Sequence, residues 1–241
     1  QAVDAIDPAL GFFVRWIEEF AKHAERLEVI CLKKGAYTLP ANVHVHSLGK
    51  EKGASRVGYL VNFYTYLWRL RHDYDTVFVH MNPEYVVLGG FLWRLLRKRI
   101  ALWYTHKSVN LKLRIAELFA NSIFTASKES FRLPSKKVYV MGHGIDTDFF
   151  CPDPSIARGD WSLSVGRLMS SKRHDLAIQK AVREGKMLRI AGEGPERTRL
   201  EALAKELPAT VQFLGALSQA QLRDAYRRAA LLIHTSATGS L

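Results

Sequence analysis

The chain has 241 residues, of which 48% are hydrophobic and 24% charged, so it can bury a sizeable core as one large or two smaller domains. Its longest apolar run, around residues 85–93, is far shorter than the ~20 residues that a membrane-spanning helix needs, and no signal peptide is visible. The formal charge of +12 points to an anionic partner, which could be nucleic acid, a phosphorylated small molecule or acidic lipid headgroups.

The two cysteines, Cys31 and Cys151, lie far apart and lack metal-ligand spacing. They predict free thiols in a reducing compartment, hence a cytoplasmic protein, and no metal site. The chain opens with Gln1 instead of methionine, so its start is expected to be trimmed.

Strand and helix patterns alternate through the first half of the chain. A helical apolar face is predicted on Phe13, Trp16, Ile17, Phe20 and Ala24. Apolar strands are predicted at residues 27–32, 43–47, 76–80, 100–104, 122–126 and 138–141, with helices between most of them. This alternation is typical of an α/β fold.

The alternation restarts after a polar, proline-containing stretch at residues 144–158, which predicts a domain boundary there. Strands are expected at residues 161–165, 187–191, 211–215 and 231–235, separated by helices at 173–184, 195–207 and 218–229. Apolar strands joined by helical crossovers predict a parallel sheet, whose ligands bind at the carboxyl ends of the strands.

Several residues in the second half fall at those carboxyl ends, among them Gly166, Gly192, Gly215 and Thr235. Arg167 and Lys172 leave the first of these strands where a helix N-terminus also points, and this combination attracts phosphate. A diphosphate would neutralise both cations. The alternative is that they are two solvated surface cations.

The segment "IAGEGPERTRL" (190–200) repeats this geometry. Gly192 and Gly194 would let the backbone approach a ligand, and Pro195 is expected at the first helical position. The segment lacks the third glycine of the dinucleotide fingerprint, so an ordinary strand-to-helix turn is the competing interpretation.

Four segments in fixed order, "VYVMGHGIDTDFFCPDP", "SVGRLMSSKRHDLAIQKA", "IAGEGPERTRLEAL" and "VQFLGALSQAQLRDAYRRAALLIHTSATGS", resemble the retaining glycosyltransferases of family 4 (glycosyl transferases group 1). The first half resembles them more loosely, through "DPALGFFVRWIEEFA", "WYTH" and "FTASKES". The resemblance implies the GT-B fold: α/β, with two Rossmann-like domains, here an acceptor-side domain (1–148) and an incomplete nucleotide-sugar domain (149–241).

The resemblance further implies transfer of a hexose, with retention of configuration, from a UDP- or GDP-linked sugar to a glycan or lipid-linked acceptor, without a further cofactor. Arg167 and Lys172 match the family's pair that contacts the donor diphosphate. His106 matches the histidine that faces the transferred sugar, although a histidine in an ordinary strand-end turn is the alternative.

Further donor-binding positions follow from the same resemblance. Those near the phosphates, the base and the sugar are Gly11, Gly166, Gly192, Gly194, Phe213, Leu214, Gly215, Thr235 and Ser236. The chain departs from the family in two places, because only residues 1–7 precede Pro8 and because the family's acidic pair, eight positions apart, is absent. The chain is therefore expected to be truncated at both ends, to bind donor weakly and to leave residues 231–235 as an exposed edge strand.

Two segments, 58–75 and 90–107, mix aromatic residues with Arg and Lys. This pattern suits either a face on the inner membrane surface or helices packed on a sheet with snorkelling cations. The alternatives to a glycosyltransferase are a basic nucleic-acid-binding module, supported by charge alone, and a GT-B relative such as a sugar-nucleotide epimerase. A glycosyltransferase would need no specific nucleic acid.

Overall fold

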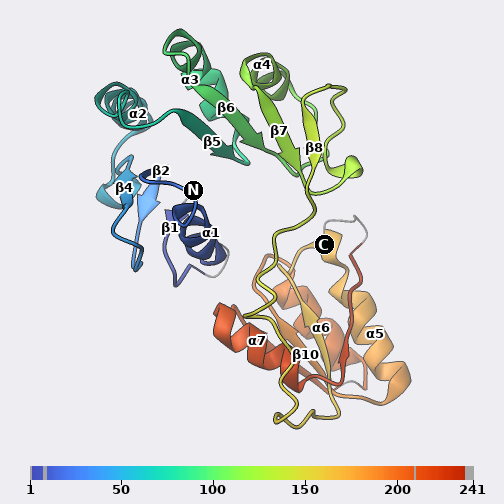
Figure 1. The fold of residues 1–241 in the computed structure, drawn as a ribbon. Helices are drawn as coiled ribbons and strands as arrows, with labels where there is room; N and C mark the ends of the chain where they lie inside the picture. The colour runs from blue at the N-terminus through green and yellow to red at the C-terminus, as the bar shows by residue number, and fades with distance from the viewer. Residues whose placement is uncertain (1, 8–9, 209, 237–241) are drawn as a thin grey trace. The chain divides into compact units, whose positions relative to one another are not determined.

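The computed structural model describes residues 2–7, 10–208 and 210–236, in which helices and strands alternate along the chain (Figure 1). The contacts between these residues form two compact units. Unit 1 contains the N-terminal residues up to Ala5 together with Phe12–Gly144, and unit 2 contains Ile6–Gly11 together with the residues from Ile145 onward. Each unit has a parallel sheet and helical crossovers, as predicted for an α/β chain.

The larger sheet of unit 1 has four parallel strands in chain order, β5-β6-β7-β8. The strands are β5 (Thr76–His80), β6 (Arg99–Trp103), β7 (Ser122–Thr125) and β8 (Val138–Val140). The helices α2 (Arg56–Arg69), α3 (Pro83–Leu95) and α4 (Leu111–Phe119) cover one face of this sheet (Figure 1). Ile100, Leu102 and Ile123 are fully buried beneath them, because the central strands are apolar on both faces.

The remaining elements of unit 1 form two small parallel pairs of strands and one helix. They are β1 (Ala2–Val3) with β3 (Lys33–Lys34), β2 (Leu27–Cys31) with β4 (Val43–Ser47), and α1 (Phe12–Ala21). Val3, Val14, Ile17 and Cys31 form their common core. β1 and β3 were not predicted, because two residues are too short to show a period.

Helix α1 ends three residues before Ala24, which was predicted on its apolar face. The Asn42 side chain donates hydrogen bonds to the carbonyl oxygens of Ala21 (2.9 Å) and Ala24 (2.8 Å). A residue distant in sequence thus satisfies carbonyls that a longer helix would have used, and the helix stops.

The sheet of unit 2 has the order β11-β10-β9-β12, with every pair parallel. Its elements are β9 (Ser162–Val165), α5 (His174–Glu184), β10 (Leu188–Ala191), α6 (Arg197–Glu206), β11 (Val211–Gly215), α7 (Gln219–Arg228) and β12 (Leu231–Leu232). Residues of α5 and α6 share one core with Leu188 and Ile190, whereas Ala225 and Ala229 at α7 pack with Trp161. The chain therefore winds in both directions from β9, where the strand order reverses.

Two predicted boundaries in unit 2 differ from the structure by two or more residues, at the start of α6 and at the end of β12. Pro195 precedes α6, which begins at Arg197, because the Glu196 amide donates to the Leu168 carbonyl and holds this turn in a loop. The strand predicted at residues 231–235 is only two residues long. It pairs with β9 alone among the described strands, and Leu231 and Leu232 are exposed, which agrees with the predicted edge.

Three short 3-10 turns complete the fold: η1 (Lys50–Lys52), η2 (Lys128–Ser130) and η3 (Ser170–Lys172). Within the described ranges, the helices are all too short or too polar to cross a bilayer.

Candidate functional site

The predicted glycines of unit 2 meet at the carboxyl edge of its sheet. Val165 and Gly215 both pair with Ala191, so the ends of β9, β10 and β11 lie side by side. The Gly166 amide donates to the Ala191 carbonyl (3.0 Å), and the Gly192 amide donates to the Gly215 carbonyl (2.8 Å). All three glycines have positive φ values, of 146°, 145° and 73° in chain order, which side chains rarely tolerate.

The loops after β9 and β10 interlock. The Leu168 amide donates to the Glu193 carbonyl (2.9 Å), and the Leu168 carbonyl accepts from Glu196 (3.0 Å). A Cβ atom on Gly192 would lie 1.9 Å from the Gly166 oxygen, and one on Gly194 would lie 2.3 Å from the Leu168 oxygen. The close packing of the two loops therefore requires both glycines, independently of any ligand.

The two predicted cations occupy this interlocked edge at the point where the strand order reverses. Arg167 is exposed, and no carboxylate forms an ion pair with it in the part of the chain that the structure describes. Lys172 ends η3, and its Cγ and Cδ atoms lie 3.7 Å from the position of a Cβ on Gly166, so its stem lies against the β9 turn. Helix α5 begins two residues later, and its N-terminus adds positive potential.

The segment after β12 holds the cationic loop in place. The Thr235 hydroxyl lies 2.9 Å from the Lys172 carbonyl oxygen and 2.8 Å from that of Arg173, and it shares its proton between them. The Ser236 hydroxyl is 3.5 Å from the Ser171 carbonyl oxygen. Thr235 and Ser236, predicted near the donor phosphate and sugar, thus have a positioning role through residues more than 60 positions away.

His174, the first residue of α5, belongs to the same edge but was not predicted. Only 3% of it is exposed, and its Nδ1 is 2.9 Å from the hydroxyl oxygen of Ser164 on β9. Burial lowers the pKa of His174, and the positive charge of Lys172 lowers it further, although the backbone at Gly166 and Arg167 opposes the shift. The neutral ring ties the cationic loop to β9. The sequence feature that could have indicated this role is the position of His174, directly after Lys172 and Arg173 at the start of a helix.

Phe213 and Leu214, predicted near the donor base, are core side chains on opposite faces of the sheet. Phe213 packs beside α5 and α6, with the guanidinium of Arg197 5.9 Å from its ring centroid. Leu214 packs with Trp161 on the α7 face. A single base cannot stack on both side chains, and of the predicted trio only Gly215 takes part in the carboxyl edge, where its carbonyl accepts from the Gly192 amide.

The two remaining predicted site residues, His106 and Gly11, have simple local environments. His106 is exposed in the loop after β6, where its Nδ1 accepts a hydrogen bond from the Ser108 amide (3.0 Å). Gly11 is buried directly before α1, and its amide donates to the Asp7 carbonyl (2.8 Å). Pro8, in the same loop, lies outside the described residues.

Comparison with known proteins agrees with the fold and the edge. Residues 157–241 match the family model described as Glycosyl transferases group 1. Among curated proteins, none matches the chain. HepE from Anabaena, solved with UDP and glucose, is 16% identical with a TM-score of 0.72, over 98% of this chain and 73% of HepE.

Two further solved structures are similar at lower scores. TarM from S. aureus, solved as a mutant with Fondaparinux, alpha-GlcNAc-glycerol and UDP, has a TM-score of 0.56 and 14% identity, over 74% of this chain and 40% of TarM. MnaA from S. aureus, solved with UDP, has a TM-score of 0.53 and 12% identity, over 98% of this chain and 73% of MnaA.

The chain is therefore an α/β protein of the GT-B type with two Rossmann-like domains, as predicted. The predicted resemblance to glycosyl transferases group 1 is confirmed for residues 157–241, which contain the whole interlocked edge and both of its cations.

Proposed function

We propose that the protein is a retaining glycosyltransferase of family 4 that transfers a hexose from a UDP- or GDP-linked sugar to a glycan or lipid-linked acceptor. The observation that carries this proposal is the reversal of strand order at β9, where glycine turns of positive φ, Arg167, Lys172 and the α5 N-terminus gather. The family match of residues 157–241 and the UDP in similarly folded proteins support it.

The chemistry of this edge suits a departing diphosphate. When the bond between the sugar and the phosphate oxygen breaks, negative charge accumulates on the leaving phosphate. Arg167 and Lys172, on the interlocked loop, stabilise the greater negative charge of the transition state more than they stabilise the bound donor. This difference lowers the barrier. Thr235 and His174 hold the loop in place before the donor binds. Little conformational entropy therefore has to be lost to order this loop during the reaction.

The acceptor hydroxyl would then attack from the face that the phosphate leaves, and the phosphate would take its proton. This route retains the configuration of the sugar and needs no nucleophile from the protein. We assign His106 to the sugar-facing position and Gly11 to the loop near the donor phosphates. The donor itself carries the transferred group, so we propose no separate cofactor.

Calorimetric titration with UDP and with GDP tests the assignment. Arg167→Ala and Lys172→Ala each remove a charge-assisted contact of roughly 1.5–3 kcal/mol, which corresponds to about a ten- to hundredfold loss of affinity. Arg183→Ala and Lys205→Ala, near the C-terminal ends of α5 and α6, are matched controls that should bind as the parent does. Parental affinity in both site variants would overturn the proposal.

A further inference from the structure

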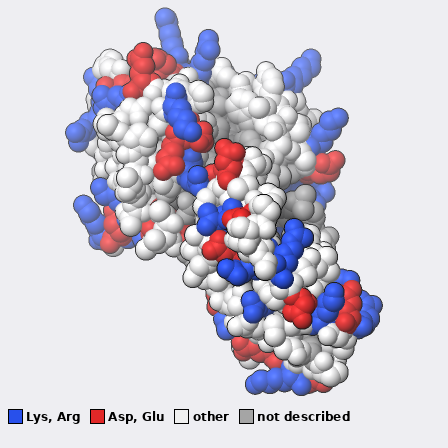
Figure 2. Space-filling view, turned by 60° about the horizontal axis from the view of Figure 1, so that its bottom comes forward, with Lys and Arg blue, Asp and Glu red and all other residues white. Residues whose placement is uncertain are grey.

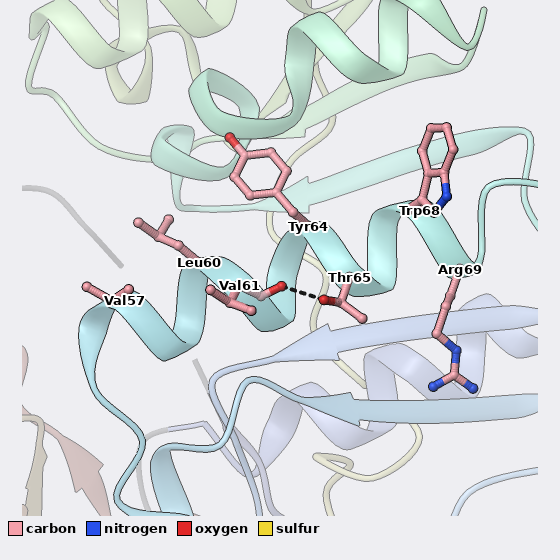
Figure 3. Close-up of a pocket in the computed structure, with 7 residues that line it drawn as sticks. All are labelled: Val57, Leu60, Val61, Tyr64, Thr65, Trp68 and Arg69. Atoms are coloured by element: carbon pink, nitrogen blue, oxygen red, sulfur yellow. Dashed lines mark hydrogen bonds between the residues drawn. The ribbon is translucent and has the colours of Figure 1, made fainter.

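Helix α2 of unit 1 is apolar on the side that faces away from the core. Val57, Val61 and Trp68 are 69%, 59% and 58% exposed, and Leu60 and Tyr64 lie between them. The spacing of three or four residues places all five on one face, which Figure 3 shows from outside. The opposite face carries the buried Phe63 and Leu67, so the helix is apolar on both sides.

This outward face forms a shallow, open groove of about 570 Å³ lined by α2 alone. The polar atoms beside it already have partners within the fold. The Thr65 hydroxyl donates to the Val61 carbonyl (2.8 Å) (Figure 3), and the Tyr64 hydroxyl donates to the Leu88 carbonyl of α3 (3.0 Å). What the face presents to a partner is therefore mainly rings and methyl groups.

The charged residues of α2 itself are all positive. Helix α2 contains no Asp or Glu, and it has an arginine at each end, Arg56 and Arg69. The guanidinium of Arg71 lies 4.5 Å from the ring centroid of Trp68 and donates to its carbonyl oxygen (2.7 Å). This cation–π contact joins a positive charge to the most amphipathic residue of the face.

The neighbouring helices α3 and α4 also expose apolar side chains, although each contains one glutamate, Glu84 and Glu117. Phe91 and Leu95 on α3 are 71% and 69% exposed, with Arg94 between them. Leu111 and Leu118 on α4 are also exposed. Since α2, α3 and α4 lie on the same face of the β5–β8 sheet (Figure 1), apolar exposure occurs on all three helices of this face.

Helices of unit 2 show that this composition is not the rule for solvated helices of the chain. On α6, Arg197 pairs with Glu193 and Glu201, and Arg199 pairs with Glu196. In the space-filling view, side chains of both charges interleave in the lower part of the molecule (Figure 2). Contiguous apolar exposure of the kind found on α2 marks an interaction surface.

We propose that the outward face of α2, continued by α3, is a docking surface for an anionic lipid bilayer. Trp and Tyr favour the membrane interface, apolar side chains insert into it, and arginines reach the phosphate headgroups. Cations without neighbouring carboxylates on α2 match the negative charge of a cytoplasmic leaflet. The helix would lie in the plane of the interface. The proposal goes beyond glycosyl transfer and does not depend on it.

Co-sedimentation of the 241-residue chain with vesicles tests this surface. Vesicles of phosphatidylcholine with about one third phosphatidylglycerol should bind the chain, and vesicles of phosphatidylcholine alone should bind it at least tenfold more weakly. Each cation near an anionic surface contributes about 1 kcal/mol, so Arg69→Glu should weaken binding by more than about fivefold. Leu60→Glu with Val61→Glu should abolish it.

Leu176→Glu and Arg183→Glu on α5 are the matched controls and should bind as the parent does. Circular dichroism verifies folding, and UDP affinity should be unchanged in every one of these variants. Absence of binding to anionic vesicles, or equal binding by parent and α2 variants, would overturn the proposal. So would a parental dimer in light scattering that Val61→Glu dissociates, because the face would then contact a second copy.

Discussion

The two units contain the same motif, a four-stranded parallel sheet with helical crossovers, but they differ at the carboxyl edge. In unit 1 the four strands follow chain order and the edge is filled: the His80 ring at the end of β5 lies 4.6 Å from that of Phe13, and Trp103 at the end of β6 lies 5.4 Å from Trp16. In unit 2 the strand order reverses at β9, and interlocked glycine turns of positive φ form the edge beside Arg167 and Lys172.

The difference shows that architecture alone does not make a ligand site. An anion site at a sheet edge is favoured by a reversal of strand order, which separates two loops, and by cations and a helix N-terminus at that edge. Unit 2 has both. The outer surfaces of the helices also differ between the units. The helices of unit 1 expose apolar side chains, whereas α6 of unit 2 exposes ion pairs.

The largest expected effect is the disruption of the interlocked loops at the carboxyl edge of unit 2. Gly192→Ala would place a Cβ atom 1.9 Å from the Gly166 oxygen at a φ of 145°. Strain and overpacking together should lower the free energy of unfolding of unit 2 by roughly 2–6 kcal/mol. Native-state hydrogen exchange of the β9 and β10 amides in increasing urea measures the change in unit 2.

Gly53→Ala in unit 1 is the matched control for this prediction. Gly53 also has a positive φ, 72°, but a Cβ there would contact nothing within 4 Å. It should cost only about 1 kcal/mol, the usual penalty for a side chain in the left-handed region. Equal costs at the two positions would show that the interlocking of the loops after β9 and β10 is not tight.

The second effect belongs to the filled edge of unit 1 and depends on pH. Burial lowers the pKa of His80 to about 4, whereas the unfolded chain binds this proton near pH 6.5. The unfolded state therefore takes up the proton first as the pH falls. Above pH 6.5 the ring is neutral in both states, and His80 does not lower the free energy of unfolding. On acidification to pH 4 the free energy of unfolding should decline by roughly 2–3 kcal/mol.

His80→Phe keeps a ring beside Phe13 and Trp16 while removing the titration, so its unfolding free energy should fall less between pH 7 and pH 5. Exposed His44→Gln is the control and should follow the parent. Parallel curves for parent and His80→Phe would contradict the burial of a neutral His80. His174 leaves a residual slope of the same sign, because burial lowers its pKa as well.

The smallest effect compares helix starts in the two units. Ser218 caps α7 in a reciprocal box: its hydroxyl accepts from the Gln221 amide (3.3 Å) while its own amide donates to the Gln221 side chain (2.9 Å). Ser55 caps α2 with one bond, from the Gly58 amide (3.2 Å). Ser218→Ala should cost about 1 kcal/mol and Ser55→Ala about half of that. The reverse order in thermal unfolding would refute the comparison.

Most strands were predictable because each is a short apolar run between turn residues. The runs at 76–80 and 211–215 match β5 and β11 to the residue. Helix ends were less predictable, since Asn42 ends α1 and Leu168 delays α6 from distant positions. In the candidate site, Arg167 and Lys172 followed from their place at a strand end, but the positioning roles of His174 and Thr235 did not.

The sequence by itself determined the alternation of strands and helices, the glycines at the strand ends and the excess of cations, because these depend on periodicity and composition along a local segment. Only the tertiary structure decided the order β11-β10-β9-β12, which brings Thr235 to Lys172 across 63 positions. It also decided that Gly192 meets the Gly166 carbonyl and that Trp68 faces outward while Leu67 is buried. Strand pairing and the choice of buried face are long-range, since they depend on which apolar surfaces cover one another, and no local pattern records that.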